Sequence, residues 1–131
     1  MRNNILLIDD DEEMCEEIAD ALGSEGYDVS VCNDGLEGYA LIKDKDWDLV
    51  LLDVRLPGMS GLDILKSVRE MKMETHIIVI TGMPMTGAIL TEQNGTLTAR
   101  NELLKLADGI LSKPFNRAAM LAKVKSAMER P

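Results

Sequence analysis

Residues 49–53 read LVLLD, four apolar residues followed by an aspartate. Two further stretches have the same character, ILLI at residues 5–8 and IIVI at residues 77–80. A strand that is apolar at every position is typical of a parallel sheet with helices on both sides, because both faces of the strand are then buried. The three stretches therefore predict the middle of a parallel α/β sheet.

Shorter stretches at residues 28–32 and 109–111 are expected to add two strands, which makes five. Between and after the strands, apolar residues recur at helical spacing. Strands and helices alternate five times, so we expect a doubly wound α/β fold with five parallel strands and five helices. Ser60 and Asp63 have the spacing of a capping box that begins the third helix.

The composition describes one folded domain of 131 residues, of which 46% are hydrophobic. The net charge is −9 and only 3% of the residues are aromatic, which disfavours contact with phosphate backbones, stacked bases and anionic lipids. No apolar run approaches the ~18 residues of a membrane span, and the acidic amino terminus does not fit a signal peptide. We expect a cytoplasmic protein that binds neither nucleic acid nor membrane directly.

Cys15 and Cys32 fit neither a disulfide framework nor a zinc site, because no histidine stands at ligand spacing from them. We therefore expect two buried free thiols.

His76 is the single histidine and is expected at the surface, where the fourth strand begins. Residues 3–42 contain acidic residues but no lysine or arginine, so the negative charge is concentrated in this part of the chain.

Polar side chains stand where four of the predicted strands end. The carboxyl ends of parallel strands meet at one edge of the sheet, and open α/β sheets bind their ligands there. Carboxylates about 4 Å apart repel by roughly 4 kcal/mol at an effective dielectric near 20, so a group of three requires a cation. Oxygen ligands with room for water favour Mg²⁺. In strand order, the polar residues are Asp9, Asp10, Asp53, Thr81 and Lys113.

An alternative is that Asp9, Asp10 and Asp11 only cap the first helix, whose dipole stabilises acidic side chains at its amino terminus. This alternative does not explain why an aspartate, a threonine and a lysine end the other strands. The pattern over four strands therefore favours a metal site.

Four segments together resemble the receiver domain of two-component response regulators. They are ILLIDDDEE at residues 5–13, VLLDVRLPGMSGLDIL at 50–65, IIVITG at 77–82 and ILSKPF at 110–115. The resemblance covers the whole chain and implies a single receiver domain over residues 1–131. It also implies a flavodoxin-like, CheY-like sheet with strand order 2-1-3-4-5.

By this resemblance, Asp53 is the phosphoacceptor. Asp9 and Asp10 would hold Mg²⁺ directly or through water, together with Asp53 and the backbone carbonyl of Arg55. A carboxylate nucleophile would then attack a phosphoryl group whose charge the metal neutralises, while the protein supplies position and electrostatics.

The resemblance also implies roles for Thr81 and Lys113. Thr81 would bond the phosphoryl oxygens and Lys113 would pair with them. The peptide bond between Lys113 and Pro114 is expected to be cis, as in this family, which directs the ammonium group toward the pocket.

The sequence departs from the family pattern at the expected switch. Receivers usually carry an aromatic residue three positions before the lysine, whereas this chain has Ile110. The expected switch thus consists of Thr81 and Ile110, without an aromatic side chain.

The segment between Thr81 and Lys113 is also longer than the family pattern. We expect phosphorylation to change how well residues 82–97 are ordered. Its apolar residues are expected to pack an additional helical turn or to form a partner surface; they are Met83, Met85, Ile89 and Leu90.

The predicted function is that of a phosphoacceptor signalling domain and not of a conventional enzyme. A sensor histidine kinase or a histidine phosphotransfer protein would donate the phosphoryl group, and autodephosphorylation would remove it. Phosphorylation would change the binding of a downstream effector or of a fused output domain. Either a stand-alone receiver or an excised amino-terminal domain would have this sequence.

Two other functions remain open at this point. One is a receiver-like interaction module that takes no phosphate. The other is a haloacid-dehalogenase-like phosphatase, which would use Asp9 and Asp11 after the first strand. Chain order disfavours the phosphatase, because that class places its further metal-binding acids after the lysine, whereas Asp53 precedes both Thr81 and Lys113. The chain also has no room for a cap domain.

Overall fold

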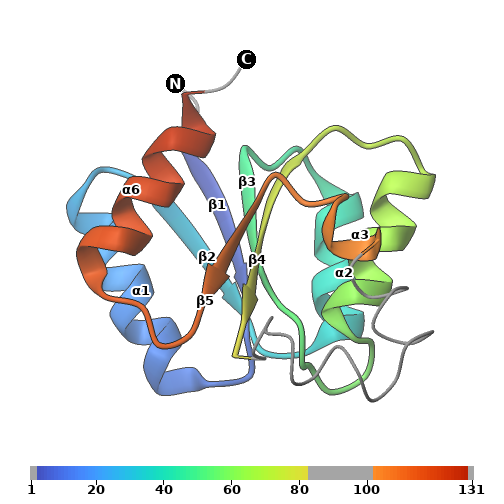
Figure 1. Cartoon of the computed structure of the whole chain (residues 1–131), viewed down its shortest axis with the longest axis horizontal. Coiled ribbons are helices and arrows are strands. Elements are labelled where there is room, and N and C mark those ends of the chain that lie inside the picture. Colours follow the sequence, from blue (N-terminus) through green and yellow to red (C-terminus); the bar gives the residue numbers. More distant parts are fainter. Residues whose placement is uncertain (1–2, 83–101, 130–131) are drawn as a thin grey trace.

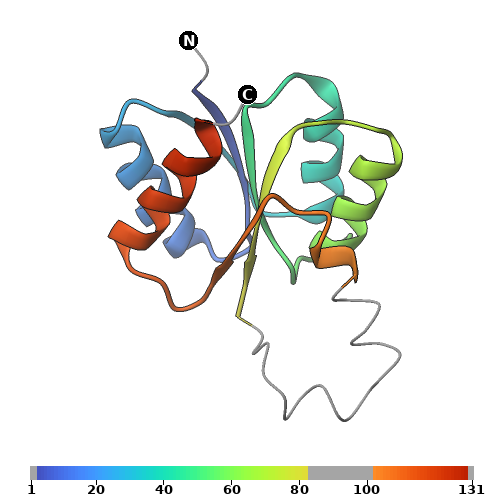
Figure 2. The same ribbon diagram turned by 45° about the horizontal axis from the view of Figure 1, so that its top comes forward.

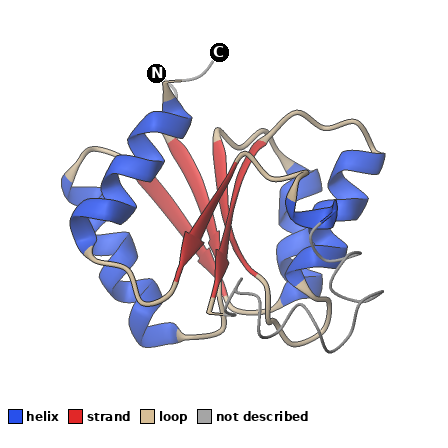
Figure 3. Ribbon diagram, in the orientation of Figure 1, coloured by secondary structure: helices blue, strands red, loops and turns tan. Residues whose placement is uncertain are grey.

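The computed structural model describes residues 3–82 and 102–129, and these contain one parallel sheet of five strands. The strand order is β2-β1-β3-β4-β5, which confirms the predicted fold class. Figure 3 shows the sheet in red between two pairs of helices. The strands are β1 (Asn4–Ile8), β2 (Asp28–Cys32), β3 (Leu49–Asp53), β4 (His76–Thr81) and β5 (Gly109–Ser112).

The helices cover both faces of the sheet. In Figure 1, α1 and α6 lie on one side and α2 and α3 on the other, and Figure 2 shows the same layers after rotation. Residues 102–104 are also helical and precede β5. They lie between the fourth and fifth strands, where the fourth of the five helices is expected, and residues 83–101 before them are outside the described part of the chain. The bounds are α1 (Glu12–Ser24), α2 (Gly35–Asp44), α3 (Gly61–Glu70) and α6 (Arg117–Met128).

The central strands are apolar throughout because alternate side chains enter two different cores. Leu49 and Leu51 of β3 belong to the core beneath α1 and α6, while Val50 and Leu52 belong to the core beneath α2 and α3. All four side chains are 0% exposed. Each such burial contributes about 1.5–3 kcal/mol of transfer free energy. The two cores hold the sheet, and with it the strand ends, in a fixed arrangement.

Helices α1, α2, α3 and α6 each begin next to the carboxyl edge of the sheet with a side-chain cap. The Ser60 hydroxyl accepts a hydrogen bond from the Asp63 N–H at 3.2 Å, which confirms the predicted start of α3. Such caps satisfy amides that have no partner within the helix. The N-cap residues of α1, α2, α3 and α6 are Asp11, Asp34, Ser60 and Asn116.

Two glycines allow backbone segments to approach closely at this edge. A Cβ atom at Gly35 would overlap the carbonyl oxygen of Met59, and a Cβ atom at Gly61 would overlap that of Asp53. The Gly61 N–H also donates to the Val54 carbonyl at 2.9 Å. The start of α3 is therefore packed directly against the end of β3.

The peptide bond between Lys113 and Pro114 is cis, as predicted. Both cysteines are buried and unbridged, which confirms that prediction as well. None of the helices that the structure describes has the length and apolarity to cross a membrane.

Candidate functional site

Three polar side chains are buried at the carboxyl edge of the sheet. Asp9 directly follows β1 and is 0% exposed, Asp53 ends β3 at 4%, and Thr81 ends β4 at 3%. Over residues 3–82 and 102–129, these three are the buried polar or charged residues. Burial of ionisable groups is costly unless they are compensated, so such a group marks a candidate functional site.

Lys113 provides part of the compensation. Its Nζ atom lies 3.4 Å from Oδ2 of Asp9 and 3.7 Å from Oδ2 of Asp53. The backbone places this lysine beside β4, because the Lys113 N–H donates to the Thr81 carbonyl at 2.8 Å. One ammonium group thus faces two buried carboxylates, which leaves the pocket with excess negative charge.

The three predicted acidic ligands lie together. One carboxylate oxygen each from Asp9, Asp10 and Asp53 falls within 4.8 Å of the others. Asp10 is exposed, so the group opens to solvent on one side. Oδ1 of Asp9 accepts the Asp11 N–H at 3.0 Å, while its buried Oδ2 has no hydrogen-bond partner among the described residues. The cluster is all oxygen, it opens to solvent on one side, and its buried Asp9 Oδ2 has the Lys113 ammonium at 3.4 Å but accepts no hydrogen bond from the described residues. Such a cluster fits Mg²⁺, which retains water ligands.

Burial and the charge of the pocket raise the pKa of Asp53. Burial is the larger cause and the neighbouring Asp9 carboxylate the next; together they raise the pKa from 3.8 to about 6, although Lys113 opposes the shift. Additional positive charge near Asp53 would stabilise its ionised form. The electrostatics and the ligand geometry therefore both favour a cation at this position.

The predicted site residues occupy different places relative to this pocket. The structure brings together Asp9, Asp10, Asp53 and Lys113, and Thr81 ends the strand next to Asp53. Arg55 is exposed in the connection between β3 and α3. Ligation by its carbonyl remains a prediction.

The predicted switch residue Ile110 lies within β5 and pairs with Val79 of β4. It is partly buried against the core beneath α2 and α3. The apolar residues of the long segment lie outside the described residues, so the predictions made for them remain open; they are Met83, Met85, Ile89 and Leu90.

His76 begins β4, as predicted, but it is half-buried and not fully at the surface. Its side chain is only 20% exposed, and Nδ1 lies 3.7 Å from Oδ1 of Asp108. Asp108 precedes β5 and is held beside His76, because it also accepts hydrogen bonds from the Ile77 N–H at 2.7 Å and from Arg69 at 3.0 Å. The apolar pattern of β4 gives no sign of this contact, which comes from a distant part of the chain.

Sequence reasoning missed Asn33, which follows β2. Its Nδ2 atom donates to the Asp9 carbonyl at 2.8 Å. The Cys15 thiol also points to this carbonyl, with Sγ 3.4 Å from the oxygen. Burial, followed by the charge of Asp9, raises the pKa of Cys15 to about 12, so the thiol stays protonated as a weak donor. Asn33 is the polar residue that follows β2, so examining the end of this strand as well as the other four would have found it.

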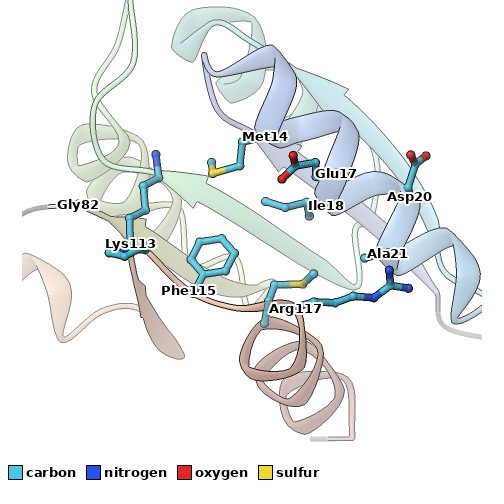
Figure 4. Close-up of a pocket in the computed structure, with 11 residues that line it drawn as sticks. Met14, Glu17, Ile18, Asp20, Ala21, Gly82, Lys113, Phe115 and Arg117 are labelled. Carbon is cyan, nitrogen blue, oxygen red and sulfur yellow. The ribbon is translucent and has the colours of Figure 1, made fainter.

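A groove of about 810 Å³ adjoins the acidic pocket, between α1 and the start of α6 (Figure 4). Its lining is largely apolar, and the Phe115 ring lies within it. Lys113 lines the groove as well as facing the carboxylates, so the two features are continuous. The charged lining residues are Glu17, Asp20, Lys113 and Arg117.

The strand order and the strand-end site together define a CheY-like α/β domain. The chain matches the family model of the response regulator receiver domain over residues 5–125 and belongs to this family. It is 35% identical over 96% of its length to the cell cycle transcriptional regulator CtrA of Caulobacter vibrioides, of which it covers 50%. It is 32% identical over 99% of its length to the DNA-binding response regulator MtrA of Mycobacterium tuberculosis, of which it covers 52%. The chain thus spans about half the length of these curated relatives.

Solved receiver structures agree along nearly the whole chain. The receiver domain of the Francisella response regulator 1452 has a TM-score of 0.83 and 25% identity, with 98% of both chains covered. The BeF3-activated N-terminal receiver domain of Klebsiella pneumoniae RstA has a TM-score of 0.79 and 27% identity, covering 98% of this chain and 100% of its own. The chain is therefore a receiver domain in fold and in family.

Proposed function

We propose that this chain is a phosphoacceptor domain in which Asp53 takes a phosphoryl group from a phosphohistidine. The donor is a sensor histidine kinase or a histidine phosphotransfer protein. One observation carries the proposal: carboxylate oxygens of Asp9, Asp10 and Asp53 lie within 4.8 Å of one another. Family membership supports it, because the cluster stands at the strand ends that carry the resemblance.

In the proposed site, the carboxylates of Asp9, Asp10 and Asp53 and the carbonyl of Arg55 hold Mg²⁺. When bound, the ion neutralises the charge of the phosphoryl group during transfer. The protein thus contributes a preformed set of oxygen ligands to a step that depends on position and electrostatics.

The reaction is a displacement at phosphorus. A carboxylate oxygen of Asp53 forms the new P–O bond while the P–N bond to the donor imidazole breaks, and the imidazole leaves with the bonding electron pair. Lys113, whose Nζ is 3.7 Å from Oδ2 of Asp53, pairs with the phosphoryl oxygens. The Thr81 hydroxyl, at the end of the adjacent strand, bonds another of these oxygens.

The groove beside Lys113 supports docking of the phosphodonor at this edge. The apolar lining of the groove suits an apolar stripe on a partner helix, and the acidic side chains of Glu17 and Asp20 suit basic residues beside that stripe. The output remains open between a separate effector and a fused domain. MtrA is described as DNA-binding, and we propose that any such activity resides outside the present domain, which is strongly acidic.

The two alternative functions receive less support. A phosphatase that uses Asp9 as nucleophile would need that carboxylate free for attack, yet Oδ1 of Asp9 accepts the Asp11 N–H and Oδ2 faces Lys113. An interaction module without phosphorylation would not require three buried polar groups at one edge, which cost stability.

Site mapping after acetyl phosphate treatment in Mg²⁺ separates the three functions. We expect label on the peptide that contains Asp53 and none on the peptide that contains Asp9. Label at Asp9 would support the phosphatase, and a protein that takes no label would support the interaction module.

A further inference from the structure

The turn between β2 and α2 contacts the loop that carries Asp9 and Asp10. The Asp9 N–H donates to the Cys32 carbonyl at 3.1 Å, and the Asp9 carbonyl accepts the side-chain amide of Asn33 at 2.8 Å. Both backbone polar groups of Asp9 are therefore bound by the end of β2. Since Asp10 is the next residue, the same contacts set the direction in which the chain leaves β1.

The same turn also contacts the connection that follows Asp53. The Gly35 N–H donates to the Pro57 carbonyl at 2.9 Å. A Cβ atom at Gly35 would overlap the carbonyl oxygen of Met59, so the two backbones are in direct contact. Residues 32–35 thus join the two segments that contain the acidic cluster and Arg55.

Asn33 is the stronger of the two donors to the Asp9 carbonyl. The other donor is the Cys15 thiol at 3.4 Å, and a thiol is a weak donor. Asp9 also donates its N–H to the Cys32 carbonyl, and its carboxylate contacts the Asp11 N–H and Lys113. Loss of the Asn33 amide would leave the Asp9 carbonyl with the weak Cys15 thiol as its remaining donor among the described residues.

We propose that Asn33 is a positioning residue for the metal site: its amide fixes the Asp9 carbonyl and thereby the placement of the Asp9 and Asp10 carboxylates. The inference rests on the proposed function, because it assumes that these carboxylates bind Mg²⁺. Mg²⁺ demands near-ideal octahedral geometry, so small displacements of its ligands lower affinity. Removing a contact that orients a metal ligand typically lowers the affinity for the metal by about 10–100-fold.

Mg²⁺ titration of Asn33→Ala tests the proposal, with the Asp11 amide signal in NMR as the readout. Asn3→Ala is the matched control, since Asn3 also donates its side-chain amide to a backbone carbonyl, that of Gly26 at 3.1 Å. Asn33 is exposed, so we expect a moderate weakening of Mg²⁺ binding by about 3- to 10-fold for Asn33→Ala. We expect no change for Asn3→Ala, and equal melting temperatures of the two metal-free variants.

The outcomes separate the inference from the proposed function. Absence of Mg²⁺ binding by the wild-type protein would contradict the proposed function itself. Wild-type affinity in Asn33→Ala would overturn the inference and leave the function intact, and so would a lower melting temperature with unchanged affinity. Asn33→Ser, whose shorter side chain does not reach the carbonyl, provides a second variant that should weaken binding to the same extent if Asn33→Ala does not fold.

Discussion

Asp53 is an ionisable side chain that is 4% exposed and lies beside a second carboxylate. Burial and the charge of Asp9 raise its pKa to about 6 in the folded protein, whereas its ordinary value is 3.8. Between these values, the folded protein holds a proton that the unfolded chain has released. The contribution of Asp53 to the free energy of unfolding therefore falls as the pH rises from about 4 to about 6, and it is constant above that range.

This difference predicts a specific pH dependence for the metal-free protein. Urea unfolding in the presence of a chelator should show the wild-type protein losing stability relative to Asp53→Asn between about pH 4 and pH 6. The asparagine cannot titrate, so the variant provides the baseline. Parallel curves for the two proteins over this range would contradict the raised pKa.

Mg²⁺ competes with the same proton. The apparent affinity for Mg²⁺ should rise from about pH 5 to about pH 7 and then level off, because Asp53 is ionised above its pKa of about 6. Calorimetric titration at several pH values measures this. An affinity that does not change with pH would indicate that Asp53 is not a ligand.

Asp10 is the exposed member of the acidic cluster, so its substitution tests the metal site with little effect on packing. Asp10→Asn should abolish phosphorylation from acetyl phosphate in Mg²⁺, since the variant loses one of three carboxylate ligands. Glu13→Gln, an exposed acid on α1, is the matched control and should label normally. Labelling of Asp10→Asn at the wild-type rate would show that the cluster is assigned wrongly.

At the level of secondary structure, the start of α3 is packed so closely that only glycine fits. Gly61→Ala would force a Cβ atom against the Asp53 carbonyl oxygen, so we expect a destabilisation of about 2 kcal/mol or more, with reduced phosphorylation. Gly23→Ala in α1 is the control, because no atom lies within 4 Å of its added Cβ. It should stabilise the protein by up to ~1 kcal/mol through helix propensity. Denaturant unfolding compares both, and equal effects would contradict the close packing.

The strands were predictable because their physical cause is local. A stretch such as residues 49–52 is apolar at every position, and in the structure its side chains enter two cores alternately. The strand ends follow from the same pattern, which is why Asp9, Asp53 and Lys113 could be placed at one edge. The strand order came from the family resemblance, because the apolar pattern alone does not specify which strands are neighbours.

Contacts between distant segments were not predictable in this way. His76 lies beside Asp108, which precedes a different strand, and neither residue carries a local signal for the contact. Asn33 likewise reaches Asp9 across 24 positions of the chain. The role of the long segment between β4 and β5 stays a prediction, since residues 83–101 lie outside the described part of the chain.

For the molecule as a whole, metal binding and folding are coupled. The metal-free pocket holds carboxylates that a single ammonium offsets only in part, and a ligand that binds the folded state alone stabilises it by mass action. At a Mg²⁺ concentration about 100-fold above the dissociation constant, the gain is about 2.7 kcal/mol, which raises the melting temperature by several degrees. Calorimetry with Mg²⁺ and with chelator measures the shift. The site would not be formed if the wild-type protein and Asp10→Asn shifted equally.

The intact mass of the protein after acetyl phosphate treatment tests whether Asp53 is a Mg²⁺-dependent phosphoacceptor. The wild-type protein should gain the mass of one phosphoryl group in Mg²⁺ and none in chelator, while Asp53→Asn should gain none in either condition. A wild-type protein that stays unmodified in Mg²⁺, or an Asp53→Asn protein that gains the same mass, would contradict the proposed function.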